Sequence, residues 1–230
     1  MMLDPLYMMM ILPGVALALI ATFVTKTMFA KYARVGASSG LTGSEAARQL
    51  LHSQGLNDVP VEMTQGFLTD HYDPRTRTLN LSPQVYQSQS LSAIGVACHE
   101  AGHALQHANH YAPLALRSSF VPAAQFGSTL AFPIFCVGLI FGLPFLVKAG
   151  ILVFGFTVLF TLITLPVEWN ASSQAKRLMV ESGIVTPQEQ PAAASVLNAA
   201  FLTYVASAVT AILTLMYYLM RAGLLGRRND

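Results

Sequence analysis

Two histidines and a glutamate occur with the spacing H-E-x-x-H at His99, Glu100 and His103. The motif lies in a run from Leu91 to His107 that predicts one helix. Residues four apart share one face of a helix, so both imidazoles would point at a single zinc ion. Glu100 would lie beside that ion, where it can take a proton from a water molecule. The spacing therefore predicts a zinc hydrolase in which Glu100 is the catalytic residue.

A zinc hydrolase needs a third protein ligand, and Glu168 is the strongest candidate. It directly follows a long uncharged stretch, where an acid is costly unless it is paired or binds a cation. His107 continues the stripe of histidines, but it lies about 6 Å further along the helix axis. His71 and His110 are further alternatives. The simpler role for Glu168 is a charge at the start of a helix.

Three polar side chains are candidates to support the zinc ligands by hydrogen bonding. Ser172 lies one helical turn after Glu168, and Asn170 lies between them in the sequence. His107 is the third, because it follows the motif on the same face. Partners of this kind orient the histidines that bind a metal. Capping and solvation are the alternative roles of such residues near a helix start.

The strand predicted at 76–82 precedes the motif helix and suggests a place for substrate. An edge strand can bind an extended peptide through its backbone. Leu79 and Asn80 are the residues that we expect to contact a substrate there. Tyr204 is a candidate donor to the oxyanion, although interfacial packing is the commoner role of such a tyrosine.

The chain has 230 residues, of which 53% are hydrophobic and only 10% are charged, against about 25% charged in an ordinary soluble domain. Four uncharged stretches are long enough to cross a bilayer, which needs about 20 apolar residues. The predicted spans are 6–25, 122–146, 149–167 and 199–220. Buried core helices are the alternative, but they are usually shorter. We expect the first span to be a retained anchor. The expected fold class is therefore mainly α, an integral membrane protein with about four transmembrane helices.

The polar section 30–117 predicts a small α+β, zincin-like section that carries the H-E-x-x-H helix. A capping box at Thr42–Glu45 begins a helix that ends near residue 54. Short strands are expected at 59–63, 67–69 and 76–81, with 71–75 as a connection. This section is too short to hold much of a core alone. We therefore expect residues 1–230 to form a single membrane-embedded unit.

The second and third spans are separated only by a few residues around Lys148, which predicts a helical hairpin. A hairpin returns Glu168 to the side of the membrane that holds the motif. Basic residues flank the spans on both sides. Those on the motif side are Lys26, Lys31, Arg34, Arg117, Lys176 and Arg177, and those on the other side are Lys148, Arg221, Arg227 and Arg228. The excess favours a cytoplasmic active site.

Five segments of the chain resemble the bacterial neutral zinc metallopeptidases of the YugP-like type. They are Tyr72–Arg75, Leu81–Pro83, Ala97–His107, Leu165–Ser172 and Leu202–Ala206. The resemblance covers nearly the whole chain. It implies a zinc peptidase of the gluzincin kind in the bacterial plasma membrane, with Glu168 as third ligand. More distant membrane proteases of the HtpX and CAAX-processing type have Glu-x-x-x-Asp at this place, and Ser172 stands here instead of that Asp.

We therefore predict a membrane zinc metalloendopeptidase that binds one zinc ion through His99, His103 and Glu168. The expected partners are a peptide or protein substrate, membrane proteins included, and the lipid bilayer. Nucleic acid is not an expected partner, because no basic cluster is interleaved with aromatic residues. The alternative is a non-hydrolytic membrane protein with a structural or regulatory zinc site, closed by His107 or His71. A third reading is hydrolysis of a non-peptide bond.

Overall fold

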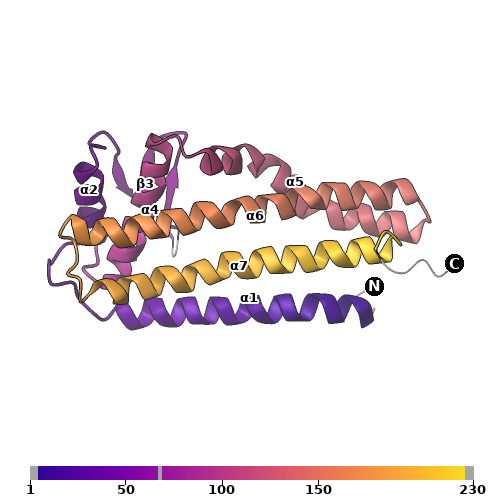
Figure 1. Ribbon diagram of the computed structural model, residues 1–230, viewed down its shortest axis with the longest axis horizontal. Coiled ribbons are helices and arrows are strands. Elements are labelled where there is room, and N and C mark those ends of the chain that lie inside the picture. The colour runs from indigo at the N-terminus through magenta and orange to yellow at the C-terminus, as the bar shows by residue number, and fades with distance from the viewer. Residues whose placement is uncertain (1–4, 67–68, 226–230) are drawn as a thin grey trace. The chain divides into compact units, whose positions relative to one another are not determined.

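A computed structural model describes residues 5–66 and 69–225, and this part of the chain is mainly helical (Figure 1). In chain order the elements are α1 (Pro5–Tyr32), α2 (Gly43–Ser53), β1 (Val61–Met63), β2 (His71–Asp73), β3 (Thr78–Leu81), α3 (Pro83–Tyr86), α4 (Leu91–Ala108), α5 (Ala112–Ile140), α6 (Pro144–Glu181) and α7 (Gln190–Arg221). The mainly helical class predicted from the sequence is confirmed.

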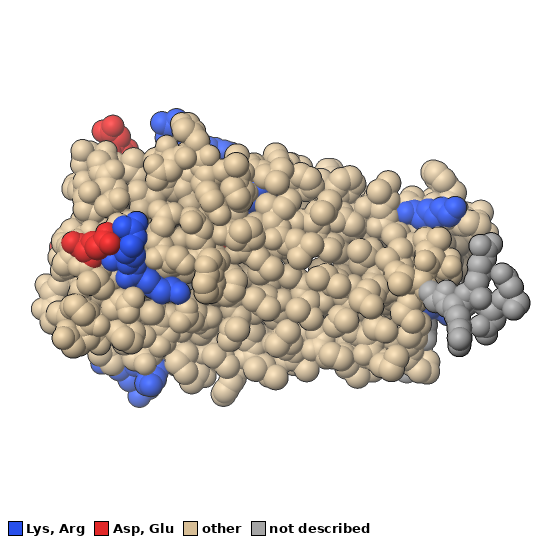
Figure 2. Space-filling model, in the orientation of Figure 1, with Lys and Arg blue, Asp and Glu red and all other residues tan. Residues whose placement is uncertain are grey.

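Four of the described helices, α1, α5, α6 and α7, are long and apolar enough to cross a membrane. Large apolar side chains on them face outward: Phe23, Ile140 and Phe145 are each more than two thirds exposed. Residues 149–167 of α6 and 190–220 of α7 include no Asp, Glu, Lys or Arg, and most of the face drawn in Figure 2 is uncharged. The expected number of spans is therefore confirmed by length and composition.

The hairpin between α5 and α6 turns earlier than predicted. The turn is Phe141–Leu143, and Lys148 lies inside α6. Gly142 has a φ of 61°, a conformation that suits glycine, and the Leu143 N–H donates to the Gly138 carbonyl at 2.8 Å. Pro144 then begins α6, where its missing N–H costs nothing. The glycine and the proline, rather than the lysine, mark the end of the second span.

The chain divides into two compact units. The first comprises the described residues of Met1–Ile20, Ala115–Pro166 and Thr203–Asp230, and the second comprises Ala21–Leu114 and Val167–Leu202. The first unit consists of apolar helix segments packed around aromatic side chains, among them Phe135 stacked on Tyr218 at 4.1 Å. The second unit holds the sheet, α2, α3, α4 and the polar ends of long helices. That residues 1–230 act as a single unit stays a prediction.

The sheet of the second unit has the strand order β1-β3-β2. β1 runs parallel to β3, with Val61 opposite Leu79, and β2 runs antiparallel to β3, with Tyr72 opposite Leu79. Residues 71–73, expected to be part of a connection, are therefore strand β2, because the turn lies at 74–77. The strand expected at 67–69 falls largely outside the described residues.

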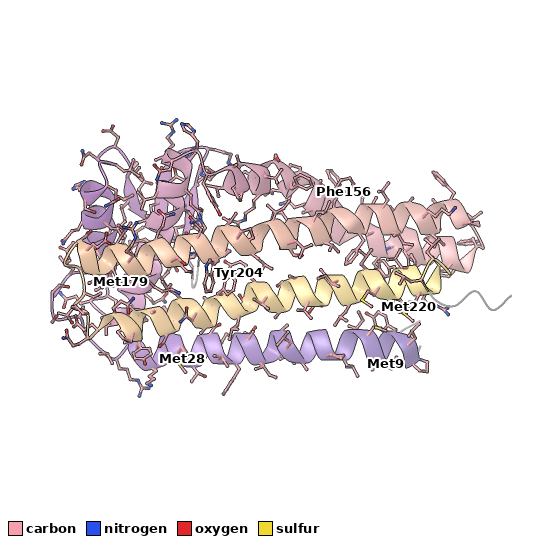
Figure 3. The ribbon with its side chains drawn as sticks, in the orientation of Figure 1. Met9, Met28, Phe156, Met179, Tyr204 and Met220 are labelled. Atoms are coloured by element: carbon pink, nitrogen blue, oxygen red, sulfur yellow. The ribbon has the colours of Figure 1, made fainter. Side chains whose placement is uncertain are left out.

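The motif helix α4 packs in the core of this unit. The Ser90 side chain accepts the Ala93 N–H and so caps its first turn. The predicted capping box of Thr42 and Glu45 is likewise present at the start of α2. The apolar core joins α2, β3, α4 and α6 through fully buried side chains: Leu50, Leu79, Ile94, Leu178 and Met179, the last labelled in Figure 3. This core holds α4 against the C-terminal part of α6.

Candidate metal centre

The structure brings His99 and His103 of α4 together with Glu168 of α6. One ligand atom from each lies within 4.8 Å of the others, and no other such group of His, Cys, Asp or Glu occurs among residues 5–66 and 69–225. Glu168 lies within the continuous helix α6, so it does not cap a helix start. His71 and His110, the alternative third ligands, are both exposed and outside this group.

The two distances from Glu168 to the histidines are close to those between neighbouring ligand atoms of a tetrahedral zinc ion. The Glu168 Oε2 atom lies 3.2 Å from His99 Nε2 and 3.6 Å from His103 Nε2. Bonds of 2.0–2.1 Å to a tetrahedral ion place neighbouring ligand atoms about 3.3 Å apart. Glu168 is only 1% exposed, and a buried carboxylate needs positive charge nearby. The donor set and its spacing therefore fit zinc.

In both imidazoles a side-chain oxygen lies within hydrogen-bond distance of the Nδ1 atom, the ring nitrogen that does not face Glu168. Ser172 Oγ lies 3.1 Å from His99 Nδ1, and Gln106 Oε1 lies 3.0 Å from His103 Nδ1. An amide oxygen can only accept, so the His103 Nδ1 atom carries the proton and its Nε2 atom presents the lone pair. Ser172 therefore contacts a zinc-ligand candidate, His99, as its predicted role of supporting a histidine by hydrogen bonding requires.

Gln106 is a site residue that the sequence analysis missed. Its side chain is 1% exposed, and its Nε2 donates to the Val167 carbonyl at 2.8 Å and to Asn170 Oδ1 at 2.9 Å. These two bonds fix the amide so that its oxygen faces His103. Asn170 thus bonds Gln106 and not a histidine. The available signal was spacing, because a residue three positions after His103 lies on the same helix face.

Replacement of Gln106 should weaken metal binding. We expect Gln106→Leu to lower zinc affinity by about 10- to 100-fold, the usual effect of losing a partner of a metal-binding histidine. Competition with a chelating dye measures this on the purified protein. Gln84→Leu, on the exposed side of α3, is the matched control and should keep wild-type affinity. Equal affinities for the two variants would contradict the role of Gln106.

Glu100 is held by the edge strand β2. Its Oε2 accepts the Tyr72 backbone N–H at 3.1 Å, and the residue is 9% exposed. The Tyr72 hydroxyl in turn shares a hydrogen bond of 2.8 Å with His107 Nδ1. His107 therefore contacts Tyr72, and neither His99 nor His103 is its hydrogen-bond partner through this atom. Tyr72 links the catalytic candidate to the end of the motif helix.

The expectation that 76–82 forms an edge strand is wrong. β3 has β1 on one side and β2 on the other, so its backbone groups are already paired. Leu79 is fully buried, and Asn80 makes a local bond to the Thr78 carbonyl at 3.4 Å. The strand next to Glu100 is the edge strand β2. Tyr204 lies half-buried on α7 in the other unit (Figure 3), and its role as oxyanion donor stays a prediction.

The surroundings change the acidity of two side chains in α4. Burial by itself would lower the pKa of His103, but the Glu168 carboxylate, whose Oε2 lies 3.6 Å from His103 Nε2, and the charge of Glu100 outweigh it and raise this pKa. A proton therefore competes with the metal for His103, since zinc binds neutral imidazole. Burial raises the pKa of the Cys98 thiol to about 12, so this neighbour of the motif offers no thiolate ligand.

Gly102, inside the motif, lets α4 and α6 approach closely. A β-carbon at Gly102 would lie 2.8 Å from the Ala171 carbonyl oxygen and 3.2 Å from the Ala171 Cα. Both are backbone atoms, so a side chain there can only be fitted by moving one helix. Glu168 and Ser172 lie on the same stretch of α6 as Ala171. The distance between the histidines and Glu168 therefore depends on this glycine.

We expect Gly102→Ala to destabilise the protein by about 1–3 kcal/mol, as overpacking does, and to weaken zinc binding. The control is Gly155→Ala in α6, where nothing lies within 4 Å of the added carbon. Thermal unfolding and zinc content in detergent micelles measure both effects. Wild-type zinc affinity together with a wild-type unfolding midpoint in Gly102→Ala would show that the contact is unimportant.

The fold and this site define a class: a multi-pass membrane protein in which two imidazoles and a carboxylate form a candidate metal centre. The chain belongs to the family described as "Putative neutral zinc metallopeptidase", which it matches over residues 7–223. It is similar to the "Putative membrane protease YugP" of Bacillus subtilis (strain 168), with 46% identity over 215 residues, 94% of this chain and 96% of that protein. No solved structure shows a significant match. The family resemblance stated above is therefore confirmed.

Proposed function

We propose that this protein is a membrane-embedded zinc metalloendopeptidase of the gluzincin type, with His99 and His103 of the H-E-x-x-H motif and Glu168 as its metal ligands. The observation that carries the proposal is the meeting of two Nε2 atoms and one carboxylate oxygen from α4 and α6. Glu100 lies on the same helix as both histidines and is held in place by Tyr72. Membership of a family described as zinc metallopeptidases supports this reading.

The residues of the chain have distinct tasks in this proposal. When bound, zinc would polarise a water molecule and lower its pKa toward neutrality. His99 and His103 offer their Nε2 atoms, while Ser172 and Gln106 hold the Nδ1 atoms. Glu100 takes the proton of the attacking water and passes it to the leaving amine.

The two carboxylate oxygens of Glu100 have different roles in this proton transfer. Oε2 is held by the Tyr72 N–H, which leaves Oε1 to receive the proton. Tyr72 thus orients the base without removing its second oxygen from the reaction.

Among the residues that the structure describes, no fourth protein ligand accompanies His99, His103 and Glu168, as a structural zinc site would require. His107 is bonded to Tyr72, and His71 Nδ1 lies 2.7 Å from the Thr69 carbonyl. Neither is part of the metal-binding group found among the described residues. A fourth position left to water is typical of catalytic zinc. We further propose that the substrates are peptides or proteins, membrane proteins included, and that the site faces the cytoplasm.

The full-length protein in detergent micelles tests the function directly. We expect it to cleave an unstructured protein such as casein, to lose this activity after dialysis against a chelator, and to regain it with one equivalent of zinc. Metal analysis before and after dialysis is the control. Cleavage that persists in metal-free protein would reject the proposal, as would a zinc-loaded protein that cleaves no member of a broad peptide library.

A further inference from the structure

A cavity of about 300 Å³ lies beyond the metal-binding group, beside the last turns of α4. Its lining includes Tyr72, Arg77, Ala104, His107, His110 and Asp58. All of these belong to the second unit. The cavity is large enough for an amino-acid side chain or the end of a peptide.

The cavity is next to Glu100 along the motif helix. Ala104 and Ala108 line it and lie four and eight residues after Glu100, on the same helix face. Tyr72 connects Glu100 with the cavity, because its backbone N–H donates to Glu100 and the residue also lines the cavity. In the proposed mechanism Glu100 protonates the leaving amine. The cavity is therefore adjacent to the leaving-group side of a bound peptide.

Two backbone positions on this cavity are unusual. Arg77, with a φ of 56°, and His110, with a φ of 51°, are the non-glycine residues of positive φ in the described part of the chain, and both line the cavity. Glycine or asparagine usually occupies such positions, since other residues are disfavoured there. Arg77 ends the turn before β3, and His110 follows the end of α4. Strained backbone conformations of this kind are often found at ligand-binding sites.

The cavity lining combines five apolar or glycine residues with five polar ones, and four of the polar residues can donate hydrogen bonds: Tyr72, Arg77, His107 and His110. Arg77 carries a permanent positive charge, which acts on the Tyr72 phenol. Its guanidinium makes no hydrogen bond or ion pair to the residues that the structure describes. His107 and His110 add two imidazoles. Asp58 is the one acidic residue of the lining.

We propose that this cavity binds a carboxylate of the substrate on the leaving-amine side, with Arg77 as its main partner. This inference rests on the proposed peptidase function. A planar guanidinium pairs with a carboxylate through two parallel hydrogen bonds. The carboxylate can come from the C-terminus of the substrate or from an Asp or Glu side chain after the cleaved bond.

The test uses zinc-loaded, full-length protein and a matched set of fluorogenic peptides. The peptides carry Glu, Gln or Lys after the cleaved bond, each is made with a free and with an amidated C-terminus, and they are otherwise identical. We expect kcat/KM to be about tenfold higher for a peptide with the favoured carboxylate, the usual effect of one charge-assisted hydrogen bond. Preference for Glu over Gln identifies a side chain as the source, and preference for the free end identifies the C-terminus.

Two arginine variants make the test specific. Arg77→Gln should remove the carboxylate preference. Arg75→Gln is the control, because Arg75 belongs to the same turn and is exposed like Arg77, but it does not line the cavity and pairs with Asp73 at 3.3 Å. This control should keep the preference. The proposal is overturned if Arg77→Gln retains the preference, or if the Lys peptides are favoured, since Asp58 would then set the charge.

A binding measurement separates this inference from the peptidase function. Isothermal titration of the same peptides into the zinc-loaded Glu100→Gln variant, with and without Arg77→Gln, needs no turnover. Carboxylate binding that depends on Arg77, without hydrolysis by the wild type, supports the cavity and counts against the peptidase. Hydrolysis without any carboxylate preference, in rate or in binding, counts against the cavity alone.

Discussion

Glu100→Gln should keep its zinc and lose about 10²- to 10⁴-fold of peptide hydrolysis, the range that a general base contributes. The amide keeps the size of the side chain and can still accept the Tyr72 N–H, which the Glu100 carboxylate now accepts at 3.1 Å. It cannot take a proton at neutral pH. Metal analysis and steady-state kinetics on the same preparation measure both parts of the prediction.

The control for this experiment is Glu62→Gln. Glu62 is an exposed residue of β1 in the same unit, and its replacement should leave both zinc content and hydrolysis unchanged. Full activity in Glu100→Gln would remove Glu100 as the base. Loss of zinc in Glu100→Gln would mean instead that the carboxylate holds the ion.

Glu168→Ala should lose zinc. Loss of a mere partner of a ligand already costs about 10- to 100-fold in affinity, so loss of a ligand should cost more. Glu168 is 1% exposed, and alanine would also leave a cavity. Glu168→Gln therefore accompanies it, because glutamine fills the same space without the charge. Zinc stoichiometry and affinity of both variants, measured in micelles, make the comparison.

Glu181→Gln provides the reference on the same helix. Glu181 forms an exposed ion pair with Arg177 at 3.0 Å, and such pairs contribute little. We expect wild-type zinc binding in this variant. Stoichiometric, tight zinc in both Glu168 variants would exclude Glu168 as a ligand and return the third position to one of the other candidates.

The sequence predicted much of the secondary structure because its local signals were strong. Long uncharged runs predicted four apolar helices, and the capping box at Thr42 predicted where α2 begins. The turn after α5 was placed too late, because Gly142 and Pro144 were less conspicuous than a lone lysine in an apolar run. Strand β2 was missed, because His71–Asp73 precedes Pro74 and resembles a turn.

The metal-binding group was only partly accessible from the sequence. The spacing of His99 and His103 requires nothing but a helix to bring them together. Glu168 was proposed because an acid at the end of an apolar run is costly, and the structure brings it beside both histidines. Gln106 and Gly102 gave no comparable signal, since a buried amide and a close helix contact depend on what lies opposite them.

Helical periodicity and the lengths of the apolar runs can be taken from the sequence directly. So can three chemically suitable side chains at spacings that a helix and a hairpin can bring together. These are local properties, set by backbone geometry and by transfer of apolar residues out of water. The middle position of β3 in the sheet, the contact of Gln106 with His103, and the cavity that Arg77 and Tyr72 line became visible in the folded chain alone. Packing and hydrogen bonding between distant segments depend on both partners, and neither partner alone specifies the contact.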